Sequence, residues 1–285
     1  MTCPLVSVVL PTFNRAWTLK DAVDSVLFQD YPYIELIVVD DGSDDDTQTL
    51  LDKYKDKLIV LKQENSGVSA ARNAGIKNSR GELIALLDSD DAWDSRKISC
   101  QVAFFEQNPD ALICQTEEIW IRKGKRVNPK VKHQKPSGMI FEQSLFLCLV
   151  SPSAVMMRRR LFDLKGYFNE AFTVCEDYDL WLRIGCRHHI HLLRQEQVFK
   201  TGGHSDQLSA RYRGMDRFRI ESMIKLIKSG QLNKKQKNAC LEEITFKCRI
   251  YSEGCLKRGR LNQGRFYSEL PKNLKQDVLN PIKLT

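Results

Sequence analysis

The sequence predicts an α/β fold: a doubly wound, mostly parallel twisted sheet flanked by helices, with a helical C-terminal appendage. Two observations predict it. In the N-terminal third of the 285 residues, continuous apolar runs alternate with amphipathic helical patterns, which is typical of parallel strands covered on both faces. From about residue 211 the pattern is helical. We therefore expect an α/β domain over residues 1–210 and a basic helical extension over residues 211–285.

The first elements alternate strand and helix. Residues 5–10 form an apolar run that Pro11 ends, and Thr18 can cap a helix that reaches Leu27 with its apolar side chains on one face. The same patterns predict strands over residues 36–39, 58–61 and 83–87, and helices over residues 47–54 and 69–78, with Gly81 ending the second helix.

The order of elements changes in the second half of the chain. Apolar runs predict strands over residues 111–114, 118–121 and 155–159, and the basic stretch 122–135 is expected to be a solvent-exposed loop or hairpin. Helices are predicted over residues 179–184, 215–228 and 234–257, with interruptions at Gly230 and in the region 259–264.

Composition excludes several classes of protein. An apolar content of 42% and a charged content of 28% are ordinary for a globular protein. The nine cysteines form no C-x-x-C pair, which argues against a disulfide framework or a zinc site and fits a reducing cytoplasm. No secretory signal pattern opens the chain, and the longest apolar stretch, residues 145–157, is too short to span a bilayer. We expect a cytoplasmic protein.

The positive charge is concentrated near the C-terminus. Residues 211–285 contain 18 Lys and Arg against 7 Asp and Glu, whereas residues 1–210 contain 26 against 29. A basic tail of this kind can bind a polyanionic partner, and we expect the anionic inner face of the cell membrane to be that partner, with no nucleic acid bound. A solvated lysine-rich face, a protein partner and a homodimer are the alternatives.

The most informative cluster is Asp88-Ser89-Asp90-Asp91, which follows the predicted buried strand 83–87. Three carboxylates at a strand end repel one another unless a cation compensates them. Mg²⁺ binds one or two carboxylates together with substrate phosphates, and ligands of open α/β sheets bind at the carboxyl ends of strands. An Asp-rich turn that caps the next helix is the alternative.

Polar clusters also follow two other predicted strands, at residues 11–15 (PTFNR) and 40–43 (DDGS). Parallel strands place such ends along one crevice. There an acid can accept the imide N–H of a nucleobase, and an aromatic ring can pack on the base. Arg72 can reach a phosphate or brace the aspartates. Each cluster alone has an ordinary structural explanation, but their occurrence together and in this order favours a nucleotide site.

These motifs resemble those of family 2 glycosyltransferases, which have the Rossmann-like GT-A fold. The resemblance covers residues 4–210 and runs through residues 6–15 (VSVVLPTFNR), 37–44 (IVVDDGSD), 65–75 (NSGVSAARNAG), 81–93 and 175–183 (CEDYDLWLR). It implies a GT-A catalytic domain over residues 1–210 that transfers a sugar from a nucleotide-sugar donor, generally with inversion at the anomeric carbon.

The resemblance also implies the residues of the donor site, which are Pro11, Thr12, Phe13, Asn14, Asp40, Asp41, Arg72, Asp88 and Ser89. Residues 11–13 would line the nucleoside pocket, and Asp41 would contact the base. A Mg²⁺ or Mn²⁺ ion would neutralise the leaving diphosphate. Its implied ligands are Asp90, Asp88, Asp91 and His204, with the direct bond made by either Asp90 or Asp91. A loop histidine without a ligand role is the alternative for His204.

Glu176 and Asp177 match the acidic pair that precedes a Trp-containing helix in the family. The resemblance implies that Asp177 is the general base, which deprotonates the acceptor hydroxyl as it attacks the anomeric carbon. Acidic capping of the helix is the alternative. The chain lacks the Q-x-x-R-W motif and the membrane helices of processive members, so we expect transfer of a single sugar.

The sequence therefore predicts an inverting, metal-dependent glycosyltransferase that uses a nucleotide-sugar, with UDP-sugar as the expected donor. The expected acceptor is a hydroxyl of a cell-surface glycan or a lipid-linked sugar. One alternative is a sugar-phosphate nucleotidyltransferase, which is disfavoured because residues 11–15 contain no Gly. The other is a catalytically inactive GT-A scaffold, which is disfavoured because the acids of every motif are intact.

Overall fold

The computed structural model describes residues 3–203, 212 and 214–279. In this part of the chain a nine-stranded sheet has the order β3-β2-β1-β4-β8-β6-β9-β5, with β7 paired to β6. The strands are β1 (Val6–Thr12), β2 (Ile34–Asp40), β3 (Ile59–Lys62), β4 (Leu83–Leu86), β5 (Ala92–Trp93), β6 (Ile113–Arg122), β7 (Lys125–Val127), β8 (Val155–Arg158) and β9 (His191–Gly202).

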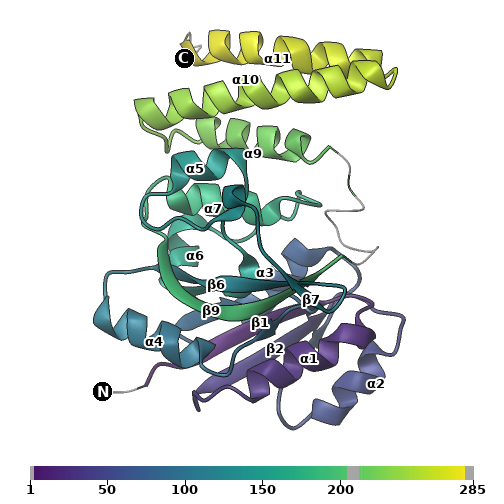
Figure 1. Ribbon diagram of the computed structural model, residues 1–285, viewed down its shortest axis with the longest axis vertical. Coiled ribbons are helices and arrows are strands. Elements are labelled where there is room, and N and C mark those ends of the chain that lie inside the picture. The colour runs from purple at the N-terminus through teal and green to yellow at the C-terminus, as the bar shows by residue number, and fades with distance from the viewer. Residues whose placement is uncertain (1–2, 204–211, 213, 280–285) are drawn as a thin grey trace.

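Helices flank this sheet and form a further layer at one end of the molecule (Figure 1). They are α1 (Ala16–Leu27), α2 (Thr47–Leu51), α3 (Val68–Asn78), α4 (Lys97–Gln107), α5 (Phe141–Phe146), α6 (Arg160–Lys165), α7 (Glu176–Gly185), α9 (Asp216–Lys228), α10 (Lys234–Lys257) and α11 (Leu261–Leu279). Short 3₁₀ turns occur at η1 (Asp52–Tyr54), η2 (Val131–His133) and η3 (Pro152–Ala154).

The sheet is parallel in its first half and mixed in its second. Strands β3, β2, β1 and β4 are parallel neighbours, β8 is antiparallel to both β4 and β6, and β6 and β9 are parallel. The predicted α/β class is confirmed.

The prediction of two strands over 111–114 and 118–121 was wrong. The polar residues Gln115 and Thr116 between them are fully buried and pair with β9 as part of a single strand.

Side chains alternate between the two faces of β1, and each face has its own core. Val8 and Leu10 pack with the apolar faces of α1 and α4, whereas Val9 packs with residues of α3 and α7 on the other face. Gly75 lets α3 approach the sheet closely, since a Cβ at this position would lie 2.3 Å from Cγ1 of Val9. The close approach holds α3, which carries Arg72, against β1 and β2.

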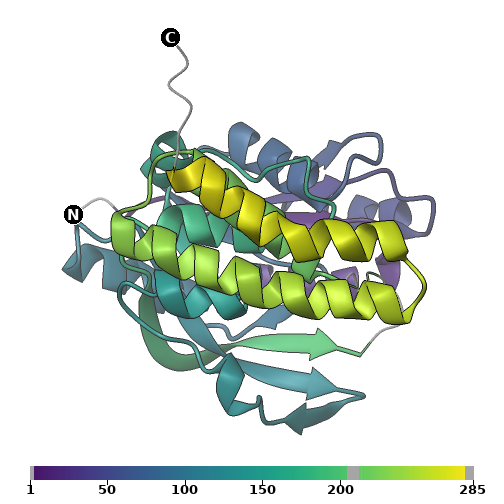
Figure 2. The same cartoon turned by 90° about the horizontal axis from the view of Figure 1, so that it is seen from above.

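The C-terminal helices extend the molecule rather than the sheet. Figures 1 and 2 show α9, α10 and α11 layered over α5 and α7, with α10 and α11 side by side on the outside. A third core joins them to the rest, and in it Tyr178 of α7 meets Ile220, Met223 and Ile244. In the part of the chain that the structure describes, none of the helices is both long and apolar enough to cross a bilayer.

Candidate active site

The loops after β1 and β2 are tied to each other. Asn14, in the left-handed region with φ of 52°, donates its backbone N–H to Ser43 Oγ (2.9 Å) and accepts the backbone N–H of Asp44 at Oδ1 (2.9 Å). Asp40 Oδ1 accepts the N–H of Ser43 (3.0 Å). The paired loops leave the Phe13 ring 42% exposed. The loops that carry the predicted nucleoside-binding residues are therefore joined, and Pro11 and Thr12 are buried at the end of β1.

Asp41 is buried, and its carboxylate organises the approach to α3. Its Oδ1 accepts hydrogen bonds from Gln63 Nε2 (2.6 Å) and the N–H of Ser66 (2.9 Å), and its Oδ2 accepts from the N–H of Gly67 (2.9 Å). Gly67 is the N-cap of α3, with φ of 90°. The predicted base-binding acid thus lies at the site, where it also fixes the loop in front of α3.

Arg72 of α3 is buried and joins two predicted motifs. Its Nη2 donates to Asp88 Oδ1 and its Nη1 to Glu176 Oε1, both at 2.7 Å. The guanidinium also lies 5.1 Å from the ring centroid of Phe168. Burial alone would lower the pKa of Arg72, but the two carboxylates outweigh burial and raise it. Arg72 is therefore a permanent cation that holds both acids in place.

Asp91 is anchored by two elements that sequence reasoning did not connect to the site. Ser153 Oγ in η3 donates to Asp91 Oδ2 (2.6 Å), and the N–H of Thr201 in β9 donates to Asp91 Oδ1 (3.0 Å). Ser153 Oγ also accepts the N–H of Asp88 (3.1 Å). Burial, with Asp90 and Asp88 nearby, raises the pKa of Asp91 well above its usual range. Both oxygens of Asp91 therefore have structural partners, and the neighbouring Ser89 is buried as well.

Asp90 has a different environment. Burial and the adjacent Asp88 raise the pKa of its carboxyl group, whereas the nearby cations Arg15 and Lys200 act in the opposite direction. In the described part of the chain no three ligand-type side chains converge on one point. The predicted ligand His204 lies outside the described residues.

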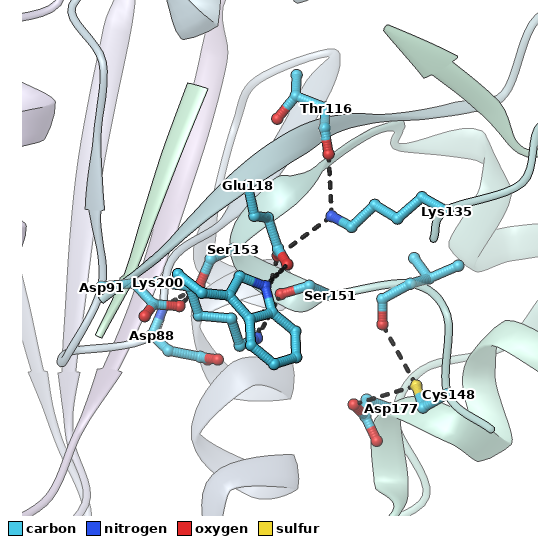
Figure 3. Close-up of polar contacts among 12 residues, drawn as sticks. Asp88, Asp91, Thr116, Glu118, Lys135, Cys148, Ser151, Ser153, Asp177 and Lys200 are labelled. Atoms are coloured by element: carbon cyan, nitrogen blue, oxygen red, sulfur yellow. Dashed lines mark hydrogen bonds and ion pairs between the residues drawn. The ribbon is translucent and has the colours of Figure 1, made fainter. Parts of the chain in front are cut away.

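The acidic pair opens α7. Cys175 is the N-cap, in the left-handed region with φ of 64°. Glu176 is buried against Arg72, and burial together with Asp177 raises its pKa to about 7. Asp177 is half-buried, and its Oδ1 accepts the N–H of Tyr178 (2.6 Å) while Cys148 Sγ lies 3.5 Å from its Oδ2. Of the two acids, Asp177 is the more exposed, and Figure 3 shows it beside Cys148.

A buried ionic cluster beside these acids was missed by sequence reasoning. Glu118 of β6 lies 3.1 Å from Lys135 Nζ and 4.0 Å from Lys200 Nζ. Burial alone would raise the pKa of Glu118, but the two lysines lower it to about 2. Figure 3 shows the cluster next to Asp88 and Asp91. Glu118 lies in a segment predicted as a strand and Lys135 ends the basic stretch 122–135, and no local pattern connects either of them to Lys200.

Comparison with known proteins gives a consistent result. The family model described as glycosyl transferase family 2 matches residues 7–164. A curated Escherichia coli protein, the UDP-Glc:alpha-D-GlcNAc-diphosphoundecaprenol beta-1,3-glucosyltransferase WfaP, is 34% identical over 184 residues, which are 63% of this chain and 70% of that protein. An uncharacterized glycosyltransferase of Rickettsia prowazekii (strain Madrid E) is 35% identical over 185 residues, 63% of this chain and 58% of the relative.

Solved structures share the fold. The crystal structure of residues 1–349 of S. aureus TarS in complex with UDP-GlcNAc superposes with a TM-score of 0.69 at 18% identity, over 95% of this chain and 92% of that one. Some matches cover only part of the relative: the chain spans 35% of a Rickettsia felis glycosyltransferase and 58% of the Rickettsia prowazekii protein. The architecture described above is thus a GT-A-type arrangement with additional C-terminal helices.

Proposed function

Because the chain belongs to glycosyltransferase family 2, we propose that it transfers one sugar from a UDP-sugar to a hydroxyl of a glycan or lipid-linked acceptor, with inversion at the anomeric carbon. One observation carries the proposal: Arg72 joins Asp88 of the strand-end loop to Glu176 of the acidic pair through two 2.7 Å hydrogen bonds. The contact supports the proposal because it joins the strand-end loop that contains Asp88 to the first turn of α7, which also carries the candidate base Asp177.

The donor part of the proposal rests on the loops after β1, β2 and β4. The exposed Phe13 ring and the buried acids Asp40 and Asp41 would receive the nucleoside, and Asp88 would receive the ribose. Asp90 would hold Mg²⁺ or Mn²⁺ together with the donor phosphates, and the ion would supply the charge that neutralises the leaving diphosphate. Asp90 is favoured over Asp91 because both Asp91 oxygens already accept hydrogen bonds.

The chemical step needs one base and no protein nucleophile. Asp177 would take the proton of the acceptor hydroxyl while that oxygen forms a bond to the anomeric carbon. The bond from this carbon to the diphosphate breaks on the opposite face, and its electron pair leaves with the diphosphate. Glu176 would not act as a second base, because its carboxylate is buried and bonded to Arg72. Its role is to hold Arg72, and through Arg72 the position of Asp88.

The acceptor part of the proposal draws on the relatives and the third layer. The name of WfaP specifies a diphosphoundecaprenol-linked acceptor, and we propose an acceptor of this lipid-linked class here. Residues 1–210 would form the catalytic domain, and the extension 211–285 would dock on an anionic membrane. The protein would then be cytoplasmic and peripheral to that membrane. Its outer helices carry five exposed apolar side chains, Phe246, Ile250, Leu256, Leu261 and Phe266. A homodimer through the same helices is the competing arrangement.

The experiment is an assay of the full chain with Mn²⁺, a panel of nucleotide-sugars and a polyprenyl-diphosphate-linked sugar. We expect release of UDP that depends on the acceptor and on Asp177. Pyrophosphate release from a nucleoside triphosphate and a sugar phosphate would instead establish a nucleotidyltransferase. Binding of UDP without hydrolysis or transfer for any donor would identify a scaffold. If the full chain binds vesicles equally well at low and high salt and at every fraction of anionic lipid, electrostatic membrane docking is rejected.

A further inference from the structure

Binding of a nucleotide-sugar at the proposed donor site requires a cation that can reach the donor phosphates. A nucleoside diphosphate is itself anionic, and Asp88, Asp90 and Asp177 all line the place where it would bind. Arg72 cannot serve as the phosphate contact, because its side chain is 4% exposed and its Nη1 and Nη2 are bonded to Glu176 and Asp88. A second positive group that is both fixed and accessible would complement a divalent ion at this site.

Lys200 of β9 meets both conditions. Its Nζ donates to Ser151 Oγ (2.8 Å) and lies 4.0 Å from Glu118 Oε1. The Lys200 side chain is nevertheless 35% exposed, whereas the Glu118 side chain is 5% exposed. The next residue, Thr201, donates its N–H to Asp91. Lys200 is therefore held by Ser151 and Glu118 while about a third of its side chain stays exposed, and Figure 3 shows it beside Asp88 and Asp91.

The charge state of Lys200 agrees with this placement. Burial alone would lower its pKa, but Glu118, Asp91, Asp88 and Asp177 outweigh burial and raise the pKa above its ordinary value. These four acids come from β6, the loop after β4 and the start of α7. The side chain stays an ammonium throughout the physiological range and does not act as a proton donor.

We propose that Lys200 is a phosphate-binding residue of the donor site and that Glu118 is its positioning residue. The ammonium contacts the diphosphate of the nucleotide-sugar. When the bond between the anomeric carbon and the diphosphate oxygen breaks, the electron pair remains on that oxygen and Lys200 stabilises the added charge. This inference rests on the proposed function and deepens it, because it assigns recognition of the diphosphate to a residue outside the family's acidic motifs.

Lys135 provides a matched control. It also pairs with Glu118, at 3.1 Å, but its Nζ donates to the carbonyl oxygen of Thr116 and its side chain is only 6% exposed. It therefore shares the carboxylate with Lys200 yet has no surface to offer a ligand. Replacing Lys135 by Met removes one positive charge from the same cluster, so the Lys135 variant separates phosphate binding by Lys200 from general support of Glu118.

The test is titration calorimetry of the full chain with UDP, UMP and uridine, with Mn²⁺ and separately in EDTA. Lys200→Met should weaken UDP binding about 10- to 100-fold, the usual effect of losing a hydrogen bond to a charged group, and leave uridine binding unchanged. Lys200→Arg should recover UDP affinity to within about threefold, because it keeps the charge. Glu118→Gln should give an intermediate loss for UDP, and Lys135→Met should give none.

The Lys200→Met variant leaves the buried Glu118 with one partner, so the double variant Glu118→Gln/Lys200→Met, which removes both charges, is measured beside it. Thermal unfolding verifies that each variant is folded. The proposal would be overturned if the ratio of UDP affinity to uridine affinity were the same in wild type and in the folded Lys200 variants. It would also be overturned if the only effect of the substitutions were a change in the KM for the acceptor. If wild type binds GDP or another diphosphate in place of UDP, the expected donor is wrong and the same series is run with that nucleotide. If no nucleoside diphosphate binds, both the proposed function and this inference fail.

Discussion

Arg72 and Glu176 are 104 residues apart in the chain, and Nη1 of Arg72 donates a 2.7 Å hydrogen bond to Oε1 of Glu176. Both side chains are almost fully buried. The bond connects α3, which packs on the parallel half of the sheet, to the first turn of α7, which belongs to the second half. Because Arg72 also bonds Asp88, a change in this one residue should alter both the donor loop and the candidate base.

Replacing Arg72 by Met should therefore reduce stability as well as activity. Removing one member of a buried, hydrogen-bonded ion network leaves uncompensated charge, which typically costs about 3–5 kcal/mol. Arg72→Lys should lose less stability but still lose transfer, because an ammonium lacks the fork that bonds Asp88 and Glu176 at once. Urea unfolding of the three proteins measures the difference. An Arg72→Met variant as stable as wild type would mean that the network carries no net stabilisation.

Asp177→Asn should separate chemistry from binding. An amide cannot take the acceptor proton, so transfer should fall about 10²- to 10⁴-fold, while UDP affinity and thermal stability stay close to wild type. The Asn side chain retains the carbonyl oxygen that accepts the N–H of Tyr178. Initial rates with saturating donor and acceptor measure the effect. Normal turnover in this variant would remove Asp177 from the role of base.

Asp90 and Asp91 should respond differently to replacement by Ala. Asp90→Ala should abolish the dependence of UDP binding on Mn²⁺ with little change in unfolding free energy. Asp91→Ala removes acceptors for Ser153 and Thr201, and a buried donor left unpaired costs about 1–3 kcal/mol. Calorimetry with and without Mn²⁺, paired with urea unfolding, distinguishes the two. The reverse pattern would make Asp91 the metal ligand.

The parallel half of the fold was predictable because its signals are local. The apolar runs that became β1, β2 and β4 are continuous and are followed by polar residues, so their order and their polar ends could be inferred from periodicity alone. The predicted end of the first strand at Pro11 was wrong, because Pro11 pairs with Val39 and β1 continues to Thr12. The second half was less visible. β9 contains Arg194 and Glu196 at exposed positions next to a register shift against β6, and this interrupts the apolar pattern that would have identified a strand.

The acids of the site were predictable, but their partners were not. Asp88 and Asp177 belong to motifs with fixed local spacing. Ser153 reaches Asp91 across 62 residues and Lys200 reaches Ser151 across 49, and such contacts depend on how β8 and β9 join the sheet. No local pattern distinguishes a buried, paired lysine such as Lys200 from a surface lysine, so only the assembled sheet identifies it.

Lys97 provides a test of stability against pH away from the active site. Its side chain is completely buried, with Nζ 3.9 Å from the ring centroid of Trp93 and hydrogen-bonded to Gln101 Oε1 (2.7 Å). Burial lowers the pKa of Lys97 from 10.5 to about 7. Between these two values the unfolded chain binds a proton that the folded chain does not, so the free energy of unfolding rises with pH across this window.

A Lys97→Met variant lacks this contribution, so its stability relative to wild type should be greatest at pH 6 and should decrease toward pH 10. The decrease should be on the order of 3–5 kcal/mol, as an upper range for a lysine with so low a pKa. Urea unfolding at each pH measures it, with Lys55→Met as the control, since Lys55 is exposed. If the Lys97 variant and wild type differ by a constant amount from pH 6 to pH 10, Lys97 is charged in the folded protein throughout, and Gln101 and the Trp93 ring suffice to solvate its ammonium.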